Sequence, residues 1–269
     1  MTTEVTGHYL WDGAADRILA AAGQAGITDF TPESLAPADQ LHAGGAQATR
    51  ALAAAVAIKP GERVLDVGSG LGGPARMLAA ECGADVTGID LSPNLVEGAT
   101  ALTARCGLSD RVRFEQGDAT TLPYGDASFD VVWTQHAVMN IEDRAALYAE
   151  MARVLKPGGR LAFQDILAGS GRPLDFPVPW APDPSVSFLR NEAETKALLA
   201  GAGLELVDWQ DVTARAAANS TEPQANLDTP GFNLVVLMGQ PFADAVTNFT
   251  HAAVDGRALI VLAVYRKPA

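Results

Sequence analysis

The sequence has few cysteines, few basic residues relative to acidic ones, and no long apolar run. Cys82 and Cys106 form neither a CxxC pair nor a metal-like cluster, so we expect reduced thiols in a cytoplasmic protein and no metal site. Lys and Arg number 19 against 32 Asp and Glu, and the net charge of −13 argues against a nucleic-acid partner. No apolar run approaches the roughly 18 residues of a membrane span, and no secretion signal is present. We therefore expect no membrane partner.

The residues that are present centre on RVLDVGSGLGG, which runs from Arg63 to Gly73. A short apolar run reaches Asp66, and a glycine cluster follows it directly. Glycines allow left-handed backbone angles and close approach to a ligand, and Pro74 fits the first position of a helix. The stretch predicts a strand, a tight turn and a helix that together hold a small ligand.

After this stretch the chain alternates strand and helix patterns, as in a parallel sheet. Ser92 and Pro93 are typical of a helix start. We expect strands at 85–89, 112–115, 129–134, 160–164, 204–209 and 257–265, and helices at 74–80, 144–155, 192–200 and 242–253. The segment Lys156-Pro157-Gly158-Gly159 is expected to be a stop and turn.

The length favours one domain with insertions. Residues 1–60 are alanine-rich and helix-like, around 14–25 and 46–56, and are expected to form an N-terminal cap or lid. Residues 61–269 are expected to form the main domain, with cap insertions at about 168–190 and 214–255. The first insertion is rich in proline, and irregular loops of this length are more often functional than idle.

Two kinds of ligand fit the glycine loop. Gly68, Gly70 and Gly73 match GxGxxG, the pattern of a dinucleotide site, and Asp90 fits a residue that binds ribose hydroxyls in either a dinucleotide or another adenosine cofactor. Asp66, directly before the glycines, is awkward for a pyrophosphate but suits an ammonium or sulfonium group. Asp118, after the third strand, offers an acceptor for an adenine amino group.

Four motifs in order, VLDVGSGLGG, GIDLS, GDATTLPYGDASFDVV and EMARVLKPGG, resemble class I S-adenosylmethionine (SAM)-dependent methyltransferases over roughly residues 60 to 166. The resemblance implies an α/β fold: a doubly wound, Rossmann-like, mainly parallel seven-stranded sheet with one antiparallel strand. It implies SAM as cofactor and S-adenosylhomocysteine as product. The cofactor-binding residues that it implies are Asp66, Gly68 and Gly70 for the methionine and ribose parts, Asp90 for the ribose hydroxyls, and Leu91, Asp118 and Ala119 for adenine.

A second segment, DQLHAGGAQAT at Asp39 to Thr49, resembles part of sarcosine and dimethylglycine N-methyltransferases and related small-molecule enzymes. If this resemblance holds, Gln40, His42 and Gly44 fold over the cofactor. Gln135 would then contact its methionine end.

Methyl transfer from a sulfonium is an in-line displacement that rests largely on positioning. Some acceptors need a general base, for which His136 and Asp165 are the candidates. Trp133 and Asn140 are candidates to shape the acceptor pocket. A carboxylate-bearing acceptor calls for a fork-shaped donor such as Arg172 or Arg190. A bulky acceptor calls for an apolar chamber, for which the candidates are Phe176, Trp180, Phe188, Phe232, Leu237, Met238 and Phe242.

The expected function is methylation of a nitrogen or oxygen of a small molecule, such as sarcosine or dimethylglycine. The alternatives are O- or C-methylation of a natural product, a cyclisation or rearrangement with SAM as a structural cofactor, a SAM-binding regulator, and an NAD oxidoreductase. We expect a small-molecule substrate as partner and a monomer or homodimer.

Overall fold

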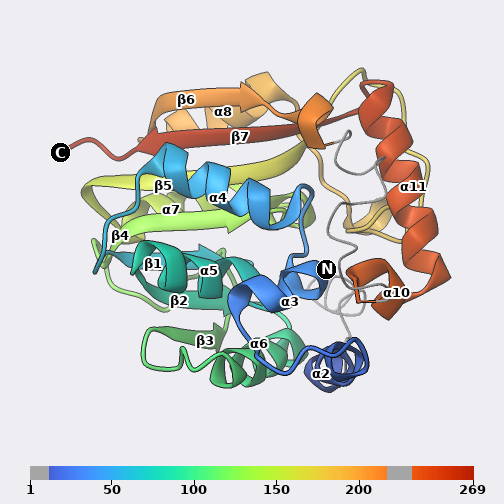
Figure 1. Cartoon of the computed structure of the whole chain (residues 1–269). Coiled ribbons are helices and arrows are strands. Elements are labelled where there is room, and N and C mark those ends of the chain that lie inside the picture. Colours follow the sequence, from blue (N-terminus) through green and yellow to red (C-terminus); the bar gives the residue numbers. More distant parts are fainter. Residues whose placement is uncertain (1–11, 217–231) are drawn as a thin grey trace.

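The computed structural model describes residues 12–216 and 232–269, and the part of the expected second insertion at 217–231 lies outside the described residues. Seven strands form one sheet in the order β3-β2-β1-β4-β5-β7-β6 (Figure 1). Strand β7 runs antiparallel to both of its neighbours, and the other adjacent pairs are parallel. This confirms the expected mainly parallel seven-stranded sheet. The strands are β1 (Arg63–Val67), β2 (Asp85–Asp90), β3 (Val112–Gln116), β4 (Phe129–Gln135), β5 (Leu155–Ala168), β6 (Glu205–Asp211) and β7 (Ala258–Arg266).

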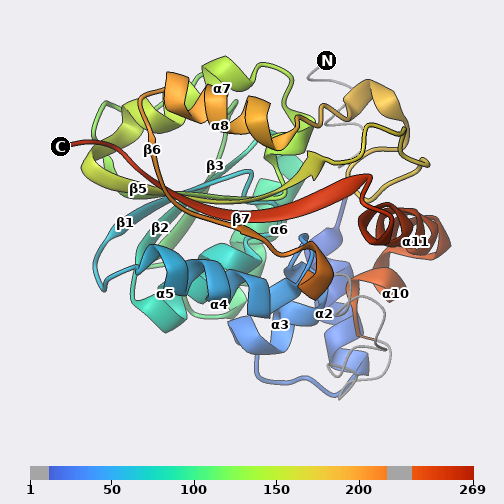
Figure 2. The same cartoon turned by 90° about the horizontal axis from the view of Figure 1, so that it is seen from above.

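Helices cover both faces of the sheet, with α4 and α5 on one side and α7 and α8 on the other (Figure 2). The Ser92 hydroxyl caps α6 by accepting a hydrogen bond from the Leu95 amide, as the sequence predicts. The helices are α2 (Ala14–Gln24), α3 (Pro32–Asp39), α4 (Gly45–Val56), α5 (Gly73–Cys82), α6 (Pro93–Arg105), α7 (Arg144–Val154), α8 (Glu192–Gly201), α10 (Leu234–Met238) and α11 (Gln240–Val254), with short 3-10 turns η1 (Val138–Asn140) and η2 (Pro184–Val186).

Alternation along the central strands divides the core into two layers. Val64, Val131 and Trp133 belong to the cluster that includes α4 and α5, whereas Leu65 and Val132 belong to the cluster that includes α7. Side chains on successive strand residues point to opposite faces, so an apolar strand can fill both layers. Burial of these side chains is the main force that holds the helices against the sheet.

The N-terminal helices α2 and α3 form a third apolar cluster together with α6. Ile18 of α2, Leu35 of α3 and Leu102 of α6 are all buried in it. Leu71, from the glycine loop itself, belongs to the same cluster. The N-terminal helices therefore pack directly against the glycine-rich loop between β1 and α5.

Strand β5 is longer than the sequence predicts at both ends. It begins at Leu155 and continues through the expected turn, with a register irregularity opposite β4 between Phe129 and Val131. Beyond Gln164 it continues to Ala168 because β7 pairs with it residue by residue over that length. The proline-rich segment that follows is irregular apart from η2 and an isolated bridge between Val178 and Ala181.

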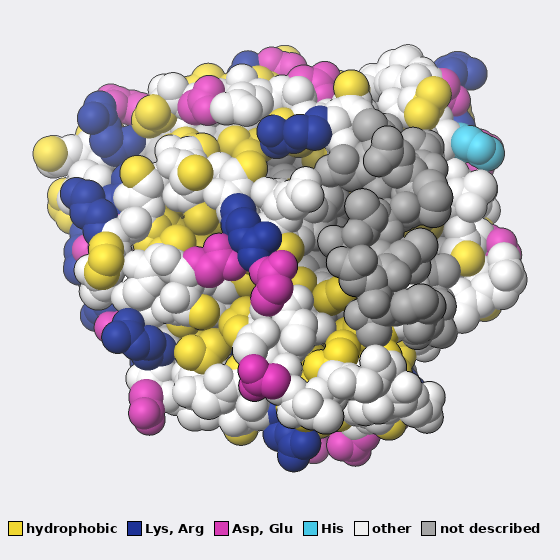
Figure 3. All heavy atoms as spheres, viewed as in Figure 1, with side chains coloured by type: hydrophobic (Ala, Val, Ile, Leu, Met, Phe, Trp, Pro, Cys, Tyr) yellow, Lys and Arg dark blue, Asp and Glu magenta, His cyan; other side chains and the backbone are white. Residues whose placement is uncertain are grey.

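Helices α10 and α11 and the N-terminal helix α2 lie at the end of the sheet where the parallel strands terminate (Figure 1). On the face shown in Figure 3, basic and acidic side chains of the described residues are dispersed among polar and apolar ones. Within the described ranges, no helix combines the length and the apolar character that crossing a membrane requires.

Candidate active site

A cavity opens at the carboxyl ends of β1, β2 and β4, below the segment that joins α3 to α4. Ligands in open α/β sheets bind at this end of the strands. Most of the cofactor-binding residues expected from the sequence come together here. The residues that line it are Asp39, Leu41, His42, Asp66, Gly68, Ser69, Gly70, Pro74, Ile89, Asp90, Leu91, Ser92, Leu95, Gly117, Asp118, Ala119, Thr120, Gln135, His136, Ala137, Asn140, Ile141, Glu142, Asp143 and Phe188.

The glycine loop forms the floor of the cavity. Gly68 has a φ of 74°, and a Cβ there would lie 2.2 Å from the Cβ of Ala137, so only glycine fits. The Gly68 amide donates to the Ile89 carbonyl at 2.9 Å, and the Gly70 amide donates to Oδ2 of Asp90 at 2.8 Å. These hydrogen bonds hold the loop against the end of β2. Because its glycines have no side chains, the space above the loop stays open.

Three carboxylates, at or just beyond the carboxyl ends of β1, β2 and β3, line this space. Burial, and secondarily the charge of Asp90, raises the pKa of Asp66 to about 8, and its Oδ2 has no hydrogen-bond partner among the described residues. Asp90 accepts amide hydrogens from Gly70 and Ser92, although burial still raises its pKa. Asp118 accepts from the amide and hydroxyl of Thr120, at 2.8 and 2.7 Å. A buried carboxylate without a partner fits a ligand that carries a cationic group.

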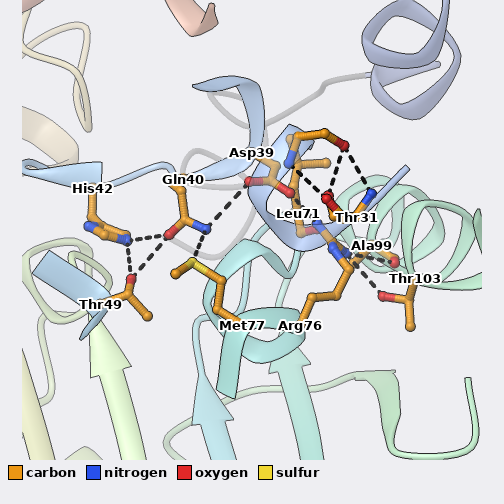
Figure 4. A network of polar contacts seen from close by, with 11 residues as sticks. Thr31, Asp39, Gln40, His42, Thr49, Leu71, Arg76, Met77, Ala99 and Thr103 are labelled. Atoms are coloured by element: carbon orange, nitrogen blue, oxygen red, sulfur yellow. Dashed lines mark hydrogen bonds and ion pairs between the residues drawn. The ribbon is translucent and has the colours of Figure 1, made fainter. Parts of the chain in front are cut away.

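The segment that begins with Asp39 forms a second wall, and a polar network anchors it (Figure 4). Asp39 pairs with Arg76 of α5 at 2.6 Å, and both side chains are fully buried. Gln40 Oε1 lies 2.9 Å from Nε2 of His42, and the side-chain amide of Gln40 donates to Met77 Sδ at 3.3 Å. Gln40 therefore supports His42 from behind and does not itself line the cavity.

Polar side chains also connect this wall to the ends of β4 and β5. Thr49 Oγ1 lies 3.1 Å from Gln135 Oε1, and Gln135 donates to Gln164 Oε1 at 2.8 Å. Gln164 in turn donates to the Ala43 carbonyl at 3.1 Å, while the Ala43 amide donates to Nδ1 of His136 at 3.4 Å. The Ala43 peptide is thus held at both its donor and its acceptor by the sheet.

Both histidines of the site are neutral at ordinary pH. Burial lowers the pKa of His42 to about 4, against a smaller opposing effect of the Ala43 carbonyl. Burial also lowers the pKa of His136, and the nearby His42 lowers it further. His136 has a φ of 50°, in the left-handed region, and its amide donates to the Gln164 carbonyl at 2.8 Å.

The structure does not bring Asp165 into the cavity. We expected it at the end of the fifth strand, but β5 runs on past it, and its side chain lies on the opposite face from Gln164. It is fully buried there, 3.7 Å from Nη1 of Arg144. Burial raises the pKa of Asp165 to about 7, and Arg144 opposes that shift.

Other expected site residues also lie outside the cavity lining, among them Arg190 and the apolar candidates Phe176, Phe232, Leu237, Met238 and Phe242. Trp133 is buried in the core. Its indole N–H donates to Oε1 of Gln135 at 3.1 Å, and Gln135 itself lines the cavity. Trp180 is buried against Phe249. Arg172 is 65% exposed and lies 3.5 Å from Asp255. Gly44 adopts a left-handed conformation at the start of α4 and borders a smaller neighbouring pocket.

Asn140 and Phe188 do line the cavity, and Asn140 also anchors the segment that carries Phe188. The Asn140 amide donates to the carbonyls of Trp180 and Val186 at 2.9 and 2.8 Å, which fixes the irregular segment. The Phe188 amide donates to the Met139 carbonyl. The sequence pattern did not identify Asp39, Ser69, Ile141, Glu142 or Asp143 as lining residues. A signal existed for Asp39, which begins the second family-like segment, and for Ser69, which lies inside the first motif.

The sheet order, the glycine loop and the three strand-end carboxylates define a nucleotide-cofactor site of the methyltransferase kind. The family described as Methyltransferase domain matches residues 65–163. Methyltransferase GfsG of Streptomyces halstedii is 36% identical over 203 residues, which cover 74% of this chain and 70% of that protein. The chain belongs to the class I SAM-dependent methyltransferases.

Solved structures show the same fold. The [4+2]-cyclase SpnF is 29% identical with a TM-score of 0.66, and the match covers 83% of this chain and 81% of that one. A Haemonchus contortus phosphoethanolamine N-methyltransferase 2, in complex with phosphomonomethylethanolamine and S-adenosylhomocysteine, is 23% identical with a TM-score of 0.71, covering 85% and 54%. A putative sarcosine dimethylglycine methyltransferase from Galdieria sulphuraria is 19% identical with a TM-score of 0.65, covering 94% and 98%. The last two likenesses concern the fold alone.

Proposed function

We propose that this enzyme moves the methyl group of SAM to an oxygen, nitrogen or carbon of a small molecule that enters the cavity beside His136 and Phe188. The observation that carries the proposal is the Asp66 carboxyl, which is 2% exposed, lines the cavity, has an Oδ2 atom without a partner among the described residues, and has a raised pKa. A cationic ligand would satisfy it. The glycine loop and the carboxylates of Asp90 and Asp118 suit the adenosine part of the same ligand.

The residues of the chain divide the work by position. Asp90 and Asp118 would hold the ribose and the adenine edge, with Leu91 and Ala119 against the ring, and the glycine loop would admit the methionine part. Bound there, SAM supplies an electrophilic methyl group on a sulfonium. The remaining task of the protein is to align an acceptor and exclude water, and this falls to the 39–44 segment and the segment that carries Phe188.

The likeness to the [4+2]-cyclase favours a second candidate function, in which the cofactor stays intact and the protein catalyses a cyclisation. The two functions would differ in the acceptor part of the cavity, where a large apolar substrate could either cyclise or receive a methyl group. Both candidates require the cofactor to bind.

The test has two stages. Isothermal titration calorimetry with SAM and with S-adenosylhomocysteine should give dissociation constants in the micromolar range, and no heat with either would refute the proposal. A screen of amines, phenols, macrolide-like alcohols and compounds that carry both a diene and an alkene then follows with methyl-labelled SAM, read by mass spectrometry. A product heavier by one methyl group supports transfer, whereas a rearranged product of unchanged mass supports the cyclisation.

A further inference from the structure

We infer that the acceptor of this enzyme carries no anionic group, so that it is an uncharged or cationic apolar molecule bearing a hydroxyl, an amine or a nucleophilic carbon. The inference rests on the proposed function and concerns the same cavity. It excludes carboxylate acceptors of the sarcosine type and phosphate acceptors of the phosphoethanolamine type.

The first support is the charge of the cavity wall. Among the described residues, no lining residue is Lys or Arg, and of the lining carboxylates only Asp39 has a cationic partner, Arg76. SAM brings its own carboxylate together with an ammonium and a sulfonium, so its negative charge is compensated within the molecule. An amino acceptor with a carboxylate or phosphate must lose its ammonium proton before it can accept a methyl group, so its anion would then stand uncompensated among like charges. The lining carboxylates are Asp39, Asp66, Asp90, Asp118, Glu142 and Asp143.

The second support is that the arginines of the surrounding segments lie outside the cavity lining, including Arg190, whose Nε has no partner among the described residues. Arg144 donates to the Phe188 carbonyl at 2.9 Å and pairs with Asp165 on the other face of the sheet. Arg172 is exposed beside Asp255. Residues 1–11 and 217–231, which lie outside the described ranges, contain neither Lys nor Arg and include three acidic residues, Glu4, Glu222 and Asp228. No side-chain cation could reach the cavity from those segments except His8.

The third support is the character of the acceptor end. Ala137, Ile141 and Phe188 are apolar, and the Asn140 amide hydrogens are already used by backbone carbonyls. His42 and His136 are neutral because burial lowers their pKa values. A carboxylate or phosphate entering here would lose water and gain no cation, which is strongly unfavourable. A hydroxyl or a neutral amine loses far less.

The site potential can be measured without knowing the acceptor. In a background in which Cys82 and Cys106 are replaced by alanine, Ile141→Cys places a thiol at the acceptor end, and Thr100→Cys places one on the exposed side of α6 as a control. We measure the rates of modification by a cationic and an anionic methanethiosulfonate, each in the presence of S-adenosylhomocysteine. The expected cation-to-anion rate ratio is at least tenfold higher for Ile141→Cys than for Thr100→Cys.

A ratio equal to or below that of the control would overturn the inference. Phe188→Cys serves as a second position if Ile141→Cys no longer binds S-adenosylhomocysteine by calorimetry. The kinetic arm uses acceptor pairs in which one member carries an anionic group and the other does not: sarcosine against its amide, phosphoethanolamine against ethanolamine, and 4-hydroxybenzoate against its methyl ester. Methylation of an acid at a kcat/KM equal to that of its neutral partner would also overturn it. Failure of SAM to bind at all would instead refute the proposed function, so the two failures are distinguishable.

Discussion

Cofactor binding should release a proton, and Asp66 should be its source. In the free protein the Asp66 carboxyl has a pKa of about 8, because burial and then the charge of Asp90 both disfavour its ionised form. An ammonium placed against it would stabilise the ionised form and lower this pKa. Binding at neutral pH therefore requires the carboxyl to lose its proton to the solvent.

The size of the effect follows from the pKa. At pH 7 a carboxyl with a pKa of about 8 is protonated to about 0.9, so about 0.9 proton per site should be released on binding. The affinity for SAM should rise about tenfold between pH 6 and pH 7 and level off above pH 8. The affinity must fall toward acid, because the free protein binds more protons than the complex.

Calorimetry in phosphate and in Tris at pH 7 measures the released protons from the difference between the two observed enthalpies. S-Adenosylhomocysteine should release the same number as SAM, since it has the same ammonium group. Asp66→Asn should abolish the release and flatten the pH dependence, while Glu142→Gln, at the exposed rim, should leave both intact. Equal enthalpies in the two buffers for the wild-type protein, with a demonstrable affinity, would refute the reasoning.

Three further predictions concern the cavity wall and floor. Gly68→Ala should weaken SAM binding at least 100-fold because of its steric clash, whereas Gly61→Ala, with a similar φ of 78° but open space around it, should cost only about 1 kcal/mol of stability and leave binding intact. Arg76→Met should lower the free energy of unfolding in urea by about 3 to 5 kcal/mol, because it leaves Asp39 buried and unpaired. His42 should make the protein less stable as pH falls from 6.5 to about 4, since the unfolded chain takes up a proton that the folded chain refuses, and His42→Gln should reduce this slope in thermal unfolding.

Each of these has an outcome that contradicts it. Equal SAM affinity in Gly68→Ala and Gly61→Ala would show that the loop does not approach the cofactor. An Arg76→Met protein as stable as the wild type would mean that Asp39 becomes protonated at little cost. Identical pH slopes with and without His42 would assign the acid sensitivity to other groups.

The sequence predicts the fold well because its signals are local. The apolar run before Asp66, the Ser92 cap and the strand that ends at Asp90 are each specified within a few residues, and all three lie where expected. The number of strands and their mainly parallel arrangement came from the family resemblance, because pairing between distant segments leaves no local signal. The length of β5 was missed for that reason: it depends on β7, which lies about a hundred residues further along the chain.

The site was predicted unevenly for a related reason. Residues directly after a strand could be placed at the cavity from the sequence, which is why Asp90, Asp118 and His136 were found. Asp165 was misplaced because side chains alternate between the two faces of a strand, so a difference of one residue decides which face a side chain occupies. Only the full length of β5 shows that Asp165 lies within the strand and not at its end. The ion pair of Asp39 with Arg76 joins two helices and has no signature in either of them.

The apolar cluster that contains Leu71 also bears on how this protein can be divided. Leu71 is packed between α2, α3 and α6, so the glycine loop takes its shape partly from a stretch well outside the matched residues 65–163. A truncated fragment that begins at β1 would keep the four class I motifs and lose one side of the support for the second glycine of the loop, Gly70. The region that carries the family motifs is therefore smaller than the unit that folds cooperatively. That region should not be expected to fold, or to bind a ligand, by itself.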